Sequence, residues 1–274
     1  MTPFPSLSKT HGIPLKEIFR YLQIKNFFQP PTNSTISPNQ FSVFENVCDK
    51  DPHARNVISA LYSQLLSQPV TGKLSYVRKW EEDFGAELST VEWGQIWNNT
   101  KTASSNVQAA ETNYKVLTRW YLVPTRVAKF SSNYSELCFR ECSDIGTYIH
   151  TWWSCPKAQI FWSEVFQLIN ALTNISFPLD PKMAIFNLKP DNLSYIQFNL
   201  ISQLLTAAKQ TIANAWKTPN VLISETVSRM NTAMTYAKMS AIEVDTIARF
   251  ESIWEPWITH TMQNTFVNEV MMPW

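Results

Sequence analysis

The stretch "CFRECSDIGTYIHTWWSCPKAQIFW", residues 138–162, decides how this chain can fold. The 274 residues include four cysteines and four histidines, and three of the cysteines and one histidine fall within this stretch. Their spacing is Cys138-x3-Cys142-x7-His150-x4-Cys155. Two closely spaced pairs of thiolate and imidazole ligands are typical of a structural zinc site, in which four ligands complete a tetrahedron. The pattern predicts one bound Zn²⁺ that stabilises a small irregular insert.

The residue after Cys155 supports this interpretation. Pro156 suits the first position of a helix, which places Cys155 near the N-cap. The helix dipole there favours the thiolate, the form of cysteine that binds metal. Three alternatives stay open: chance clustering of inert thiols, a catalytic zinc, and a nucleophilic pair of Cys155 and His150. A catalytic zinc needs an open coordination position, whereas the pattern supplies four protein ligands.

The composition predicts a mainly α-helical fold. Only five residues are glycine, which leaves little room for tight hairpins or phosphate-binding loops. The apolar fraction of 45% is enough for a sizeable core. Helices are expected at 14–28, 39–48, 54–67, 107–121, 193–216, 221–248 and 252–266, together with one ending at Gly85, one capped by Ser89 and one beginning at Pro156.

These expectations divide the chain into three segments. Residues 1–130 form a helical region, 131–156 the zinc-binding insert, and 157–274 a second helical region. The expected fold is a multi-helix assembly with one irregular insert that carries three cysteines and a histidine.

Charge and hydropathy limit the partners and the compartment. The net charge is only +1, so binding to nucleic acid has to come from a local basic patch. The N-terminus lacks the apolar segment of a secretory signal, and no apolar run reaches the roughly 18 residues of a membrane helix. We expect a cytoplasmic or nuclear protein that is not secreted and has no membrane partner. Clustered cysteines in those compartments are more often metal ligands than disulfides.

The same stretch resembles the cysteine-rich zinc-binding segment near the C-terminus of LINE-type, non-LTR retrotransposon reverse transcriptases. The shared features are the ligand spacing, Ile-Gly-Thr before the histidine, Trp-Trp after it and a downstream Phe-Trp helix. The resemblance extends to "NYKVLTRWYLVPTRVAKF" (113–130), "TIANAWKTPNVLISETVSRMNTAMTYAKMSAIE" (211–243) and "PLKEIFRYLQIKNFF" (14–28). It implies a region that binds the element's RNA and assembles its particle without doing chemistry.

The sequence indicates no enzyme activity of its own. It contains no Asp-Asp pair, although a polymerase palm needs clustered aspartates to hold its metal ions. P-loop, GxSxG and HExxH patterns do not occur either. The Glu-Glu-Asp run at 81–83 is interpreted as a solvated helix face, with a metal or acid–base role as the alternative. We expect a non-catalytic C-terminal fragment of a LINE-type reverse transcriptase.

Single-stranded RNA is the expected partner, with target DNA and other retroelement proteins as further candidates. Cations that bind phosphates and aromatic rings that stack on unpaired bases are used together in single-strand recognition. The candidate cations are Lys115, Arg119, Arg126, Lys129 and Arg140, and they are interleaved with Tyr114, Trp120, Tyr121, Phe130, Tyr134 and Phe139. Trp152 and Trp153 either stack on bases or pack in the core.

Two other functions fit the same residues. One is a helical scaffold, stapled by zinc, whose exposed tryptophans bind another protein. The other is a decayed retroelement fragment with no activity of its own.

Overall fold

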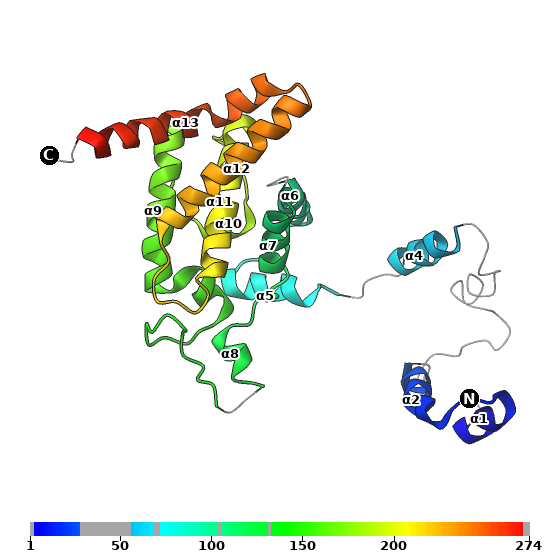
Figure 1. The fold of residues 1–274 in the computed structure, drawn as a ribbon. Helices are drawn as coiled ribbons and strands as arrows, with labels where there is room; N and C mark the ends of the chain where they lie inside the picture. Colours follow the sequence, from blue (N-terminus) through cyan, green and yellow to red (C-terminus); the bar gives the residue numbers. More distant parts are fainter. Residues whose placement is uncertain (1–2, 28–55, 68–71, 103–105, 131–132, 271–274) are drawn as a thin grey trace. The chain divides into compact units, whose positions relative to one another are not determined.

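The computed structural model describes residues 3–27, 56–67, 72–102, 106–130 and 133–270. Within these ranges the fold is helical without strands, which confirms the expected fold class (Figure 1). The helix expected at 39–48 lies outside the described residues. The chain divides into two compact units, Met1–Gly72 and Lys73–Trp274. The expected segment boundaries at 130 and 156 both fall within the second unit.

The first unit contains α1 (Phe4–His11), α2 (Ile18–Phe27) and α4 (Val57–Ser67), with a 3-10 turn before α2. Helix α1 was not predicted from the sequence. Pro3 is the N-cap and a proline occupies the first turn, where a missing N–H costs nothing. Phe4 is buried, and its ring lies 5.3 Å from that of Tyr21.

The second unit begins with α5 (Ser75–Phe84), α6 (Thr90–Thr102), α7 (Val107–Leu117) and the short α8 (Pro124–Val127). Gly85 ends α5 at φ +62°, as expected. Ser89 caps α6, also as expected: its hydroxyl accepts from the Glu92 N–H at 3.2 Å, and Glu92 accepts from the Ser89 N–H at 2.7 Å. Helix α7 ends four residues before the predicted position, because Arg119 adopts φ +58° and the chain turns.

The Glu-Glu-Asp run on α5 differs from the expected solvated face at its first residue. Glu81 is buried, with an exposed fraction of 8%. Its carboxylate pairs with Lys73 at 2.9 Å and accepts from the Leu88 N–H at 3.3 Å. A buried carboxylate has to be paired, and the partners of Glu81 lie eight residues before it and seven after it. This spacing follows no helical pattern, so the sequence did not indicate the burial.

The remaining helices are α9 (Pro156–Thr173), α10 (Pro181–Phe186), α11 (Tyr195–Asn214), α12 (Ile223–Glu243) and α13 (Ile247–Val270). Helix α10 falls in a stretch expected to be a connector, where the Asp180 side chain accepts from the Lys182 N–H at 2.8 Å and caps it. Helix α13 continues through Pro256 and lies against α9, α11 and α12 (Figure 1).

One hydrophobic core extends through the second unit and includes residues of the cysteine-rich stretch. Its largest fully buried side chains are Trp80, Trp152, Trp162, Trp254 and Trp257. Cys138 and Cys155 belong to the same cluster. The cysteine-rich stretch is therefore built into the core of the second unit.

Candidate metal centre

The four predicted ligands come together in the structure. The ligand atoms of Cys138, Cys142, His150 and Cys155 all lie within 4.8 Å of one another. The Sγ atoms of Cys138 and Cys155 are 3.9 Å apart, and Cys142 Sγ is 3.2 Å from His150 Nε2. A tetrahedral ion with metal–sulfur bonds of about 2.3 Å and metal–nitrogen bonds of about 2.0 Å needs ligand atoms about 3.5–3.8 Å apart. The arrangement can therefore hold a metal ion.

A tight loop presents the first two cysteines. The Cys138 N–H donates to the Asp144 carbonyl at 2.8 Å, and the Gly146 N–H donates to the Glu136 carbonyl at 2.8 Å. Between these bonds, Glu141 and Ser143 both have positive φ, at 57° and 69°. Left-handed conformations on either side of Cys142 turn the chain sharply and bring its sulfur back over Cys138. Neither residue is glycine, so the turn leaves no clear signal in the sequence.

The second pair of ligands comes from a wide helical turn that leads into α9. Residues His150–Ser154 form a π-helix, a form that occurs frequently at functional sites. The His150 N–H donates to Thr147 Oγ1 at 3.2 Å, and the Cys155 N–H donates to the His150 carbonyl at 2.9 Å. Cys155 is the N-cap of α9 with Pro156 at the next position, which confirms that prediction.

The surroundings shift the pKa values of three ligands. Burial raises the pKa of the Cys138 thiol to about 12. Burial acts in the same direction on Cys155, but hydrogen bonds from the Ala158 and Lys157 N–H groups outweigh it and hold the Cys155 pKa below its ordinary value. Burial also lowers the pKa of His150, which favours the neutral imidazole that binds metal. The site therefore combines one acidic thiol and a neutral imidazole with a thiol that metal binding has to deprotonate.

Arg140 belongs to the interior of this site and not to a surface. Its exposed fraction is 0%, its Nη1 donates to the Thr151 carbonyl at 2.7 Å, and its backbone N–H lies 3.4 Å from Cys138 Sγ. Its Nε and Nη2 have no hydrogen-bond partner among the described residues. If a divalent ion (+2) bound here to three thiolates (−3), one net negative charge would remain, and the Arg140 guanidinium would offset it. We therefore correct the predicted role of Arg140. It does not contact RNA but supports the loop Cys138–Gly146, called the metal loop below.

Two other predicted cations have partners within the protein. Arg119 pairs with Asp83, and its guanidinium lies 4.6 Å from the ring centre of Trp80 and 4.4 Å from that of Tyr148. This ion pair connects the end of α7 to α5. Lys115 pairs with Glu111 at 2.8 Å, and its Nζ lies 4.6 Å from the ring centre of Trp120.

The adjacent tryptophans of the π-helix differ in burial. Trp152 is fully buried, and its carbonyl accepts from Trp162 Nε1 at 2.8 Å. Trp153 is half-buried, with its ring centre 5.8 Å from that of Trp162. Of the two predicted alternatives, base stacking and core packing, Trp152 shows core packing. Of the two tryptophans, only Trp153 is partly exposed to solvent.

Beside the metal loop, a hollow of about 390 Å³ gathers three of the predicted cations. It is lined by Arg119, Arg126 and Lys129, with Lys79 from α5 as a fourth cation and Glu82 and Asp83 as acidic neighbours. Arg126 and Lys129 are exposed. Sequence reasoning missed Lys79, because it joins the others only through the packing of α5 on the end of α7.

No protein-family model matches this chain. Within the described residues, no helix has both the length and the hydropathy needed to cross a membrane.

Proposed function

We propose that the chain is a zinc-stabilised, non-catalytic module that binds single-stranded RNA, equivalent to the C-terminal region of a LINE-type reverse transcriptase. One observation carries the proposal: exposed cations and exposed aromatic rings occur together on the segment that leads into the metal loop. Arg126 and Lys129 are exposed, as are Trp120, Phe130 and Tyr134, with exposed fractions of 62%, 72% and 56%. Large aromatic side chains are normally covered in a folded chain, whereas single-strand binding needs them in reach of bases.

Zinc is the metal that best suits this donor set. Three thiolates and one imidazole, all from the protein, favour a closed tetrahedral site, and zinc is the usual occupant of such sites. Thiolate ligands require reduced cysteines, and we therefore place the protein in the cytoplasm or nucleus. When bound, the zinc would fix the loop and serve no chemical step.

The metal loop is coupled to the proposed RNA surface through α8. Gly146 packs so closely on the first residue of α8 that an added Cβ would lie 2.3 Å from Pro124 Cγ. The Thr125 N–H also donates to the Gly146 carbonyl at 3.3 Å. A rigid loop therefore holds α8, and with it Arg126, in a fixed position.

The proposal is tested by fluorescence anisotropy with a labelled single-stranded RNA over a range of salt concentrations. Binding through phosphates weakens as salt rises, because it releases counterions. Reversing both exposed cations, Arg126→Glu with Lys129→Glu, should abolish measurable binding at moderate salt while the protein stays folded. The matched control reverses two exposed cations elsewhere, Lys101→Glu with Arg249→Glu, and should bind nearly as well as the unmodified protein.

Equal losses in the two double variants would mean that only total charge matters, and no salt-dependent binding at all would sink the proposal. Adding unlabelled single-stranded DNA of the same sequence as competitor measures whether target DNA can use the same surface. Arg119 is left unchanged, because its ion pair with Asp83 makes a reversal structurally damaging.

A second candidate function, a scaffold for another retroelement protein, is favoured by one observation. Leu122, Leu137 and Ile145 are exposed around the metal loop, with exposed fractions of 47%, 52% and 57%. Exposed apolar groups of this kind occur at protein interfaces. If the unmodified protein shows no salt-dependent binding of RNA, this candidate replaces the first.

A further inference from the structure

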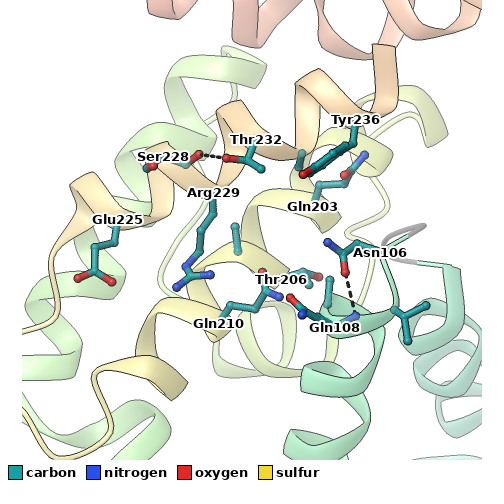
Figure 2. Close-up of a pocket in the computed structure, with 14 residues that line it drawn as sticks. Asn106, Gln108, Gln203, Thr206, Gln210, Glu225, Ser228, Arg229, Thr232 and Tyr236 are labelled. Carbon is teal, nitrogen blue, oxygen red and sulfur yellow. Dashed lines mark hydrogen bonds between the residues drawn. The ribbon is translucent and has the colours of Figure 1, made fainter. Parts of the chain in front are cut away.

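The second unit also contains an open pocket that is lined by residues of α11, α12 and the start of α7. Its volume is about 840 Å³, and Figure 2 shows its polar lining. None of its lining residues belongs to the metal loop or to the hollow lined by Arg119, Arg126 and Lys129. Most of its polar groups are uncharged amides and hydroxyls, and the charged ones are Arg229 and Glu225. The amides come from Asn106, Gln108, Gln203 and Gln210.

Arg229 offers the pocket a positive charge without a partner. It extends from α12 towards α11 in Figure 2, and it forms no ion pair with any described residue. Its Nε is buried and has no hydrogen-bond acceptor in the described part of the chain. A guanidinium without a carboxylate partner favours a ligand that brings acceptor oxygens, such as a phosphate.

The amides of Gln203 and Gln210 are also unused. Both residues lie on α11 and are half-buried, and neither side chain has a hydrogen bond to another described residue. A side-chain amide presents a donor and an acceptor together, which is the pattern found along the edge of a nucleobase. Two such amides in one pocket can therefore read a base.

The floor of the pocket is preformed. Thr206 is 1% exposed; its hydroxyl donates to the Ser202 carbonyl at 2.7 Å and accepts from Asn113 Nδ2 at 3.0 Å. Elsewhere along their contact, helices α11 and α12 are joined by a hydrogen bond of 3.0 Å between the Thr226 and Thr211 hydroxyls. Ligand binding would not have to order these walls, which saves conformational entropy.

Tyr236 supplies an aromatic ring to the pocket. It lies two turns after Arg229 on α12, so both side chains are on the same face of the helix. The ring is 61% exposed and lies across from Gln203 in Figure 2. An exposed ring beside unused amides is the usual arrangement for an unstacked base of a single strand.

We propose that this pocket binds one unpaired nucleotide of a single-stranded RNA. Arg229 contacts the phosphate, Gln203 and Gln210 hydrogen-bond the edge of the base, and Tyr236 stacks on its face. A free multivalent anion fits less well, because Glu225 also lines the pocket and a single arginine would have to neutralise both. The inference rests on the proposed RNA binding and adds to it a preference for particular bases.

The test compares the affinities of the whole chain for four single-stranded homopolymers, of A, C, G and U. We expect one to bind more tightly than the others. Gln203→Leu with Gln210→Leu should remove that preference and leave the weakest homopolymer unaffected. Tyr236→Ala, a change at an exposed position that does not threaten folding, should weaken the preferred homopolymer by roughly 5- to 150-fold. The matched controls Gln263→Leu and Arg249→Met, at exposed positions of α13, should change nothing.

Each outcome separates this inference from the proposed function. Equal affinities for the four homopolymers, unchanged in the pocket variants, would overturn the pocket inference and leave RNA binding intact. If no homopolymer binds, the proposed function fails, and saturation-transfer NMR with the four nucleoside monophosphates decides about the pocket. Transfer to a nucleotide that disappears in the Gln203→Leu, Gln210→Leu variant supports the pocket, and its absence in the unmodified protein overturns it.

Discussion

Arg140 is a buried cation beside three sulfur ligands, and its effect on the metal can be measured. Replacing it by a residue of similar length, Arg140→Met, removes the charge that offsets the thiolates. We expect the affinity for zinc to fall about 10- to 100-fold, as for other groups that support metal ligands. Competition with a chromogenic chelator measures the affinity. The same substitution at the exposed Arg249 is the control, and equal affinities in the two variants would contradict the assigned role.

Lys209 is a second buried cation, and it makes stability depend on pH. It is 1% exposed, and its Nζ donates to the Ile185 carbonyl at 3.0 Å and to Asn187 Oδ1 at 2.8 Å. Burial lowers its pKa from 10.5 to about 7. Between these values the unfolded chain holds a proton that the folded chain has lost, so the free energy of unfolding rises with pH. The contribution of the neutral Lys209 to the unfolding free energy is complete above pH 10.5. It is lost progressively as the pH falls from 10.5 to about 7.

The variant Lys209→Met isolates this contribution from those of other titrating groups. From pH 7 to pH 10 the unfolding free energy of the unmodified protein should increase by about 3–4 kcal/mol relative to the variant. Urea unfolding at both pH values measures the difference. Parallel pH profiles of the two proteins would show that Lys209 titrates normally.

At the scale of elements, the contact between the metal loop and α8 depends on Gly146. A methyl group there would lie 2.3 Å from Pro124 Cγ, so Gly146→Ala must displace α8 or the loop. We expect a loss of about 1–3 kcal/mol in unfolding free energy, the usual range for overpacking, and weaker RNA binding because Arg126 moves. Gly94→Ala is the control: its Cβ meets nothing within 4 Å, and alanine in a helix should stabilise the protein by about 0.5–1 kcal/mol.

Local signals explain which elements the sequence could predict. Gly85, Ser89 and Pro156 end or begin helices through interactions within a few residues, and all three were assigned correctly. The end of α7 could not be predicted, because the positive φ of Arg119 depends on its contacts with α5. The short α10 was missed because a stretch punctuated by prolines resembles a connector.

At the candidate site too, features set by neighbouring residues could be predicted, and features set by distant contacts could not. Ligand spacing predicted which four residues come together, since two pairs close in sequence need only one loop to meet. The burial of Arg140 depends on a carbonyl eleven residues away and on the core around it, and no pattern encodes that. The pocket of α7, α11 and α12 joins residues more than a hundred positions apart, and it carries no motif.

At the scale of the whole molecule, metal removal should affect more than one loop. Elemental analysis should find one zinc per chain in the unmodified protein and none in Cys142→Ser. Because Cys138, Cys155 and Trp152 belong to the core of the second unit, the variant should also lose near-ultraviolet circular dichroism and unfold at a lower temperature. Cys48→Ser, which changes the cysteine outside the ligand set, is the control. A full zinc content in Cys142→Ser would contradict the ligand assignment.

The π-helix that carries His150 also gives the protein a built-in optical probe. Trp152 lies within it, with its ring centre 5.2 Å from that of Tyr121, which in turn lies 6.0 Å from the exposed ring of Trp120. A paramagnetic ion such as Co²⁺ in place of zinc would quench the emission of Trp152, while a bound RNA would quench that of Trp120. Because the chain has eleven tryptophans, each event would appear as a partial loss of the total emission, and comparison with Trp120→Phe shows how much of the loss on RNA binding comes from Trp120.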